Sequence, residues 1–285
     1  MRARTPMITA ALAAAAALAC GDPEPTAVTI QFKAQVAGEP FSCTATYEGL
    51  GTTNASVQFT DLRLYVHDVR LVRESGEEVP LTLEEGDFQS DRVALLDFET
   101  REGTCQNGTA ETHDAITGAA PGFGDYVGLR FTVGVPAELD HLDSATSPAP
   151  LNVPGMFWSW AAGYRYLRVD MITSANPSFV FHMGSSGCDG TPDDGFTCAY
   201  EHRAEIALDD FDPTREAVAI DLAALLARTD LDFINDPDSD PIPGCMSGVD
   251  DPQCPDLYAP LGIPFREDSP AEDPQAVFKA LVGAQ

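Results

Sequence analysis

The chain has 285 residues and a formal net charge of −29, with 45 acidic against 16 basic side chains. A negative charge of this size argues against binding to nucleic acid or to anionic membrane surfaces, because both would repel the protein. The length suffices for one large β domain or two small ones.

The N-terminus predicts export. Arginines precede an apolar segment, residues 7–19, that ends in small residues just before Cys20. This is the pattern of a signal peptide, residues 1–19, and the apolar segment is too short to span a membrane. A cysteine at the cleavage point indicates a lipoprotein in which Cys20 is acylated, followed by a tether over residues 20–26. An ordinary secretory peptide is the alternative.

The remaining cysteines are even in number, which suits disulfides in an oxidising compartment. They are Cys43, Cys105, Cys188, Cys198, Cys245 and Cys254. The two pairs that are close in sequence are the obvious local bridges, which would leave Cys43 and Cys105 to close a long loop, although spacing alone does not fix the connectivity. Because no C-x-x-C spacing occurs, we expect neither a structural zinc site nor a thioredoxin-like motif.

Short runs of alternating apolar and polar residues predict strands along most of the chain. The first run, residues 28–36, alternates over its whole length. In the second, residues 62–71, the alternation changes phase at His67-Asp68, which predicts a β-bulge. Further strands are expected at residues 92–98, 126–135, 164–171, 178–183, 198–208 and 217–220.

Helical signals are few. Asp221 is placed to cap a short helix over residues 222–227, and residues 270–281 have the pattern of a terminal helix. Many short strands with few helices predict an all-β fold, a sandwich or barrel of mostly antiparallel strands. The Asp- and Pro-rich segment 235–255 is expected to be a loop held by its own disulfide. Its acidic run at 236–240 lacks the glycine and glutamate of an EF-hand, so a solvated loop is favoured over a calcium site.

Both tryptophans, Trp158 and Trp160, lie two positions apart, just before the strand expected at 164–171. If that strand extends back to them, the two rings point to the same side of a sheet, because side-chain direction repeats every two residues. For an arbitrary protein, rings that fill the core are the more common explanation of such a pair.

The five histidines are the candidate metal ligands, because imidazole suits copper and zinc. His182 ends an apolar strand, His141 lies in a loop, and His67 lies on the expected bulge. His202 falls on an apolar strand face, so we expect it in the core. For each histidine, a hydrogen-bonded or exposed side chain without a metal is the usual alternative.

Hydrolytic chemistry finds little support. No G-x-S-x-G nucleophile motif occurs, and the cysteines are expected to be paired. Acidic pairs such as Asp193-Asp194 suit a glycosidase, but carboxylates are so abundant that any pair is weak evidence.

Several segments together resemble one family. They include D-L-R-L-Y at 61–65, L-D-H at 139–141, W-x-W at 158–160, L-R-V-D at 167–170 and F-H-x-G-S-x-G-C at 181–188. The chain resembles the MbnP-like copper proteins, the four-Cys half of a metallo-mystery pair encoded beside a di-haem protein related to cytochrome c peroxidase and MauG. The resemblance covers nearly all of the mature chain, a single domain over residues 27–285.

The resemblance implies copper held by histidines beside a tryptophan that the di-haem partner oxidises to kynurenine. Few ligands in a largely dry pocket would favour Cu(I), because Cu(II) prefers a tetragonal set of nitrogen and oxygen ligands. The implied site residues are His67, His113, His141 and His182 as ligands and Trp158 or Trp160 as the oxidised residue. Oxidation is chemically sensible there, because kynurenine carries an amine and a ketone, whereas indole has only an N–H donor.

The resulting hypothesis is a lipoprotein on the outer membrane, at its periplasmic face or the cell surface, that is a substrate of its partner and not an enzyme. A metal-free envelope lipoprotein that acts as an interaction module is the main alternative. A copper or non-haem iron oxidase is the least favoured, because the sequence offers no clear acid/base set.

Overall fold

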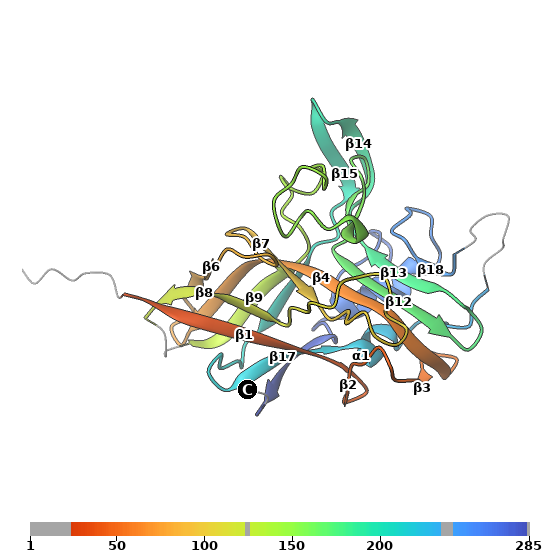
Figure 1. The fold of residues 1–285 in the computed structure, drawn as a ribbon, viewed down its shortest axis with the longest axis horizontal. Helices are drawn as coiled ribbons and strands as arrows, with labels where there is room; N and C mark the ends of the chain where they lie inside the picture. Colours follow the sequence, from red (N-terminus) through yellow and green to blue (C-terminus); the bar gives the residue numbers. More distant parts are fainter. Residues whose placement is uncertain (1–23, 123–125, 235–241, 284–285) are drawn as a thin grey trace, which may run out of the picture.

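A computed structural model describes residues 24–122, 126–234 and 242–283 (Figure 1). The predicted signal peptide, Cys20 and the acidic run at 236–240 lie outside these ranges. Within them, no helix combines the length and the apolar character that crossing a membrane requires.

The described residues form two main β-sheets. The larger has the order β16-β9-β4-β12-β13-β18, and β3, β5 and β7 also pair with β4. Its strands are β16 (Ala204–Leu208), β9 (Tyr126–Val133), β4 (Ala55–Arg73), β12 (Leu167–Thr173), β13 (Phe179–Met183), β18 (Gly244–Cys245), β3 (Tyr47–Leu50), β5 (Glu78–Pro80) and β7 (Val93–Asp97). The long strand β4 is therefore the element on which this sheet is assembled.

The smaller sheet has the order β19-β17-β1-β8-β6, and β2 also pairs with β1. Its strands are β19 (Phe278–Val282), β17 (Glu216–Asp221), β1 (Pro25–Val36), β8 (Ala115–Pro121), β6 (Thr82–Leu83) and β2 (Glu39–Pro40). Most pairings are antiparallel, with β1–β17 and β13–β18 parallel. The predicted all-β sandwich is confirmed.

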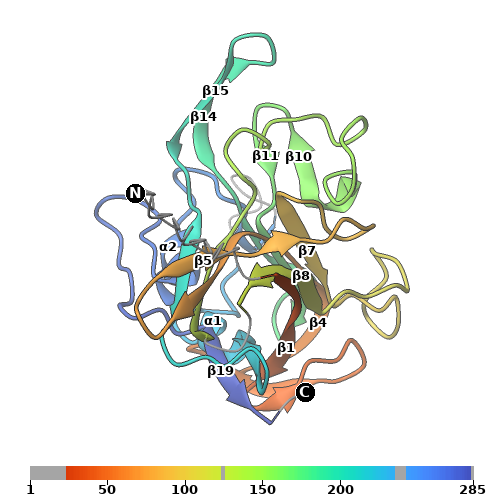
Figure 2. The same ribbon diagram turned by 90° about the vertical axis from the view of Figure 1, so that its left-hand side faces the viewer.

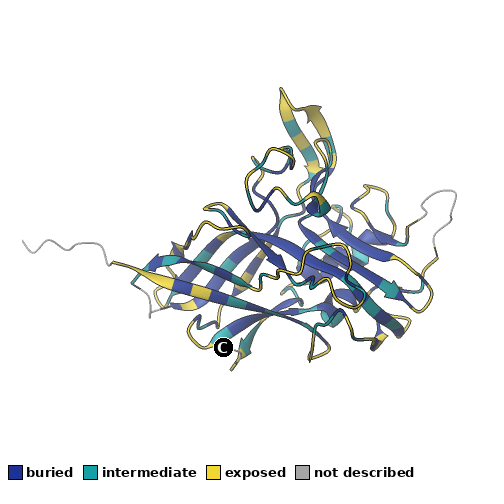
Figure 3. Cartoon of the chain, viewed as in Figure 1, coloured by how far each residue is buried: buried dark blue, intermediate teal, exposed yellow. Residues whose placement is uncertain are grey.

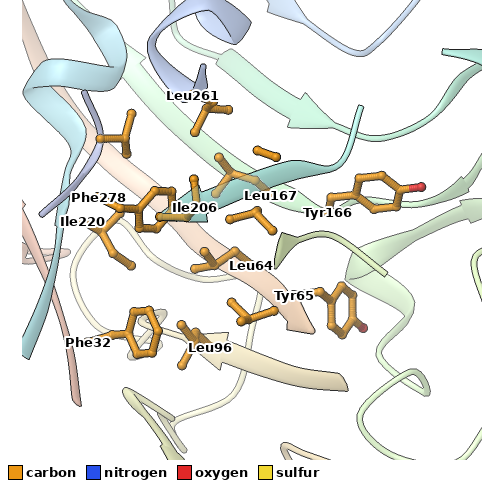
Figure 4. Packing of buried hydrophobic residues seen from close by; sticks show 14 of the residues in the cluster. Phe32, Leu64, Tyr65, Leu96, Tyr166, Leu167, Ile206, Ile220, Leu261 and Phe278 are labelled. Carbon is orange, nitrogen blue, oxygen red and sulfur yellow. The ribbon is translucent and has the colours of Figure 1, made fainter. Parts of the chain in front are cut away.

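The two sheets enclose a common core. From the smaller sheet, Phe32 and Phe278 each pack edge-on against Phe131 of the larger sheet, with ring centroids 5.7 and 5.3 Å apart. Figure 4 shows the same core, in which Leu64 and Leu167 of the larger sheet lie among the same buried side chains as Phe32 and Phe278. The alternation that predicted β1 is the pattern of burial along it, so the hydrophobic effect fixes which face of that strand turns inward.

The predicted bulge is confirmed in β4. Its pairing with β9 shifts between His67 and Arg70, and Asp68 has a φ of 51°. Val69 and Leu71 are consequently buried although they follow the opposite phase. The predicted short helix is α1 (Leu222–Leu226).

The strand expected at 164–171 is divided between β11 (Gly163–Tyr164) and β12. Two further element predictions were wrong. The segment expected to be a terminal helix ends in strand β19, which pairs antiparallel with β17. Phe278 is buried there, so ladder hydrogen bonds and tertiary packing outweigh the local helical pattern. The strand expected at 198–208 is interrupted at His202, whose φ of 52° separates β15 (Gly195–Tyr200) from β16. His202 is nevertheless buried, as predicted.

The six cysteines expected to pair form Cys43–Cys105, Cys188–Cys198 and Cys245–Cys254. The second bridge links β14 (Ser186–Thr191) to β15. This hairpin projects away from both sheets (Figures 1 and 2), and most of its residues are exposed (Figure 3). Helix α2 (Cys254–Tyr258) and the 3-10 turns η1 (Pro154–Met156) and η2 (Ala259–Leu261) complete the fold.

Candidate metal centre

The tryptophans lie on a small hairpin of their own. It is formed by β10 (Phe157–Ser159) and β11 (Gly163–Tyr164) and is separate from β12. Trp158 is half-buried, whereas Trp160 is 51% exposed. The two tryptophans line different grooves: Ser185 borders that of Trp158, and His141 borders that of Trp160. The expected pair of rings on one sheet face is therefore not what forms.

Trp158 packs against the segment that follows β13. A Cβ atom on Gly184 would lie 2.5 Å from the indole ring, so a glycine is required for the ring to lie there. The guanidinium carbon of Arg165 lies 5.0 Å from the ring centroid, in cation–π contact. The centroid of the His182 ring is 6.3 Å away. The histidine and glycine of the F-H-x-G motif thus both face Trp158.

His182 is buried between two charged partners. Its Nε2–H donates to Asp170 at 2.6 Å, and Nδ1 accepts from Nε of Arg165 at 3.3 Å. Burial lowers the pKa of His182, which agrees with this neutral tautomer. The lone pair that a metal would use therefore faces a guanidinium, and His182 would become a ligand only if Arg165 moved away.

A buried ion network supports this side of the hairpin. Asp61 accepts two hydrogen bonds from Arg63, and Arg168 lies 3.3 Å from Asp61 while also bonding Asp170. Although burial favours the neutral acid, hydrogen bonds from His182 and Arg168 lower the pKa of Asp170 to about 2. The signal for this network is visible in the sequence, because charged residues interrupt apolar strands as D-x-R and R-x-D, and the two motifs lie opposite each other across β4 and β12.

His141 presents Nε2 to two neighbours, 3.4 Å from Sγ of Cys198 and 3.6 Å from Oδ2 of Asp140. Nδ1 lies 2.5 Å from the carbonyl oxygen of Trp160, which can only accept, so Nδ1 carries the proton. The ring also stacks on Phe196, with centroids 4.5 Å apart. The lone pair on Nε2 is thereby left for a metal, and the side chain is 13% exposed. Copper accepts imidazole readily, so the donor at this position fits the metal.

Asp140, which the site prediction left out, positions His141. Its carboxylate is buried and accepts hydrogen bonds from the hydroxyls of Tyr166 at 2.6 Å and Ser185 at 2.9 Å. It also accepts the backbone N–H of Tyr164 at 3.0 Å. The loop that carries His141 is therefore bound to both the tryptophan hairpin and the segment after β13.

The other two predicted ligands are held by different elements. Nδ1 of His67 contacts the carbonyl oxygen of Gly134 at 2.8 Å, and its groove shares Glu138 with the groove of His141. Nδ1 of His113 contacts the carbonyl oxygen of Leu95 at 2.8 Å. Burial lowers the pKa of both imidazoles. The groove of His67 thus lies next to the candidate centre, whereas His113 is held at the edge of β7.

Fold and site together define a class: two-sheet β proteins with disulfide-fixed loops and a tryptophan hairpin beside histidines. The MbnP family model matches residues 25–247, and the chain belongs to this family. The solved structure of MbnP from Methylosinus trichosporium is similar, with 29% identity and a TM-score of 0.80, covering 92% of this chain and 100% of that one. A search of curated proteins gives no match. The predicted family resemblance is confirmed.

Proposed function

We propose that this protein is an exported, lipid-anchored copper protein of the outer membrane. His141 is a ligand of Cu(I), and a di-haem partner related to MauG oxidises Trp160 to kynurenine. The observation that supports this most is the contact between the two residues: Nδ1 of His141 is fixed by the Trp160 carbonyl. The other nitrogen, Nε2, lies beside Sγ of Cys198 and Oδ2 of Asp140, neither of which donates a hydrogen bond to its lone pair. Membership of the MbnP family supports the choice of metal.

The choice between the tryptophans rests on charge. Oxidation of an indole begins with the loss of an electron, which leaves a positive ring. Burial lowers the pKa of Arg165 to about 10, so its guanidinium stays charged at neutral pH, 5.0 Å from the Trp158 ring. At an effective dielectric constant of about 20, two unit charges at that distance repel by roughly 3 kcal/mol. Trp158 is therefore the harder ring to oxidise, and the exposed Trp160 is the easier one.

Oxidation of Trp160 would add a metal ligand to the site. Trp160 lines the same groove as His141, and an indole offers a metal no lone pair in its plane. The aromatic amine of kynurenine does offer one. A site with few ligands suits Cu(I), whereas Cu(II) prefers a tetragonal set of nitrogen and oxygen ligands.

Copper titration of single-histidine variants tests the proposal. Protein co-produced with the di-haem partner is titrated with Cu(I) against a chromogenic chelator. We expect about one bound copper per chain, lost in His141→Ala and retained in His113→Ala, a matched control that is also half-buried and bonded to a carbonyl. A wild-type protein that takes up no copper contradicts the proposal and favours the metal-free interaction module.

A further inference from the structure

A disulfide lies directly beside His141. Cys188 and Cys198 are register partners across the β14–β15 hairpin, and both are half-buried. Nε2 of His141 lies 3.4 Å from Sγ of Cys198, and the ligand atoms of all three residues lie within 4.8 Å of one another. In the oxidised protein the sulfur atoms are bonded to each other, so they are not available as thiolate ligands.

We propose that reduction of this disulfide converts Cys188, Cys198 and His141 into a binding site for a soft d10 cation such as Cu(I). The reductant is an external dithiol, which is oxidised to its own disulfide. The S–S bond of the protein takes up the two electrons and two protons, and two thiols form. A bound cation then displaces both thiol protons, because the thiolate is the ligand.

The spacing of the donor atoms suits such a cation. With metal–sulfur bonds of about 2.3 Å and metal–nitrogen bonds of about 2.05 Å, sulfur and nitrogen in a tetrahedral site lie roughly 3.6 Å apart. Nε2 of His141 and Sγ of Cys198 already lie 3.4 Å apart. The imidazole therefore needs little movement, and reduction has only to let the two sulfur atoms separate. Two thiolates and one imidazole form a donor set that selects Cu(I) or zinc over harder ions.

The surrounding structure keeps the three donors together after reduction. Backbone pairing continues on both sides of the cysteines, at Ser186↔Tyr200 and Asp189↔Thr197, so the hairpin does not depend on the disulfide for its register. The His141 ring is fixed independently by the Trp160 carbonyl and by stacking on Phe196 of the same hairpin.

The other two disulfides differ in a way that makes the reaction selective. Their four cysteines are buried, with at most 3% of each exposed. Asp251 lies near the sulfur atoms of Cys245 and Cys254, but both of these cysteines are fully buried. Because thiol–disulfide exchange requires access to a sulfur atom, a dithiol should reduce Cys188–Cys198 first in the folded protein.

This site goes beyond the proposed function, because it needs neither kynurenine nor the partner. The test therefore uses protein produced without the partner, in which both tryptophans are intact. The folded protein is treated with dithiothreitol, freed of it under anaerobic conditions, and titrated with Cd²⁺, a d10 probe whose thiolate complexes absorb in the ultraviolet. We expect two thiols per chain, assigned to Cys188 and Cys198 by alkylation and peptide mapping, and a charge-transfer band that saturates at one Cd²⁺ per chain.

Variants separate this site from simple thiol binding. In His141→Ala the cadmium affinity should fall about tenfold or more, whereas His113→Ala should bind as the wild type does. The double variant Cys188→Ser/Cys198→Ser should show no band. The inference is overturned if no thiols form in the folded protein, if they form without a band, or if His141→Ala binds with unchanged affinity. Absence of copper from the co-produced oxidised protein would refute the proposed function and leave this result untouched.

Discussion

Replacing Gly184 by alanine tests whether the tryptophan hairpin packs against Gly184 through the Trp158 ring. The added Cβ would lie 2.5 Å from the Trp158 ring and 2.8 Å from the carbonyl oxygen of Tyr164. The carbonyl belongs to the backbone of β11, and Arg165 covers the ring, so neither neighbour moves without losing other contacts. Overpacking of this kind costs about 1–3 kcal/mol.

Gly248→Ala is the matched control. Gly248 lines the same groove as Trp158, but an added Cβ there would lie 3.8 Å from its nearest neighbour. Urea unfolding followed by tryptophan fluorescence should show a lower midpoint for Gly184→Ala at unchanged slope, together with altered emission of the native state. Equal midpoints and emission in the two variants would refute the packing of Trp158 on Gly184.

The buried charges give two further predictions. Burial raises the pKa of Asp97 to about 7, so between pH 4 and 7 the folded protein holds a proton that the unfolded chain has lost, and stability falls as pH rises. Asp97→Asn should abolish this pH-dependent loss, so that its free energy of unfolding and that of the wild type change relative to each other by up to about 4 kcal/mol over this range. The exposed Asp193→Asn should keep the wild-type pH dependence. Identical pH profiles of stability for Asp97→Asn and the wild type would count against the buried carboxyl. Asp170→Ala leaves His182 without its buried acceptor and removes one of the two buried carboxylates beside Arg168. This change should lower the free energy of unfolding at pH 7 by about 3–5 kcal/mol. A loss under 1 kcal/mol in urea denaturation would show that this network contributes little.

The sequence predicted those elements whose cause is local. Alternation in β1, the change of phase at His67 and the cap of α1 each depend on a few neighbouring residues, and all three are present. Asp221 accepts the backbone N–H of Ala224, as a helix cap should. The even number of cysteines likewise predicted that disulfides form. The two local pairs were predictable because a short hairpin or loop brings the two cysteines of each pair together.

Elements with a distant cause were missed. β19 is a strand because the edge of β17 offers a ladder partner, and nothing within residues 278–282 encodes that. The separation of the tryptophans into two grooves depends on Gly184, more than 20 positions away in the chain. Asp140 was missed for a similar reason: in a chain this acidic, one carboxylate has no distinguishing signal until the residues that donate hydrogen bonds to it are known.

The most direct test of the account is fragment-resolved mass spectrometry of the wild-type protein, combined with metal analysis of the same sample. The account predicts the mass increase of kynurenine on Trp160, only when the di-haem partner is co-produced, and about one copper per chain. Trp158 should stay unmodified in that sample. Two unmodified tryptophans with no copper, despite an active partner, would contradict the central claim.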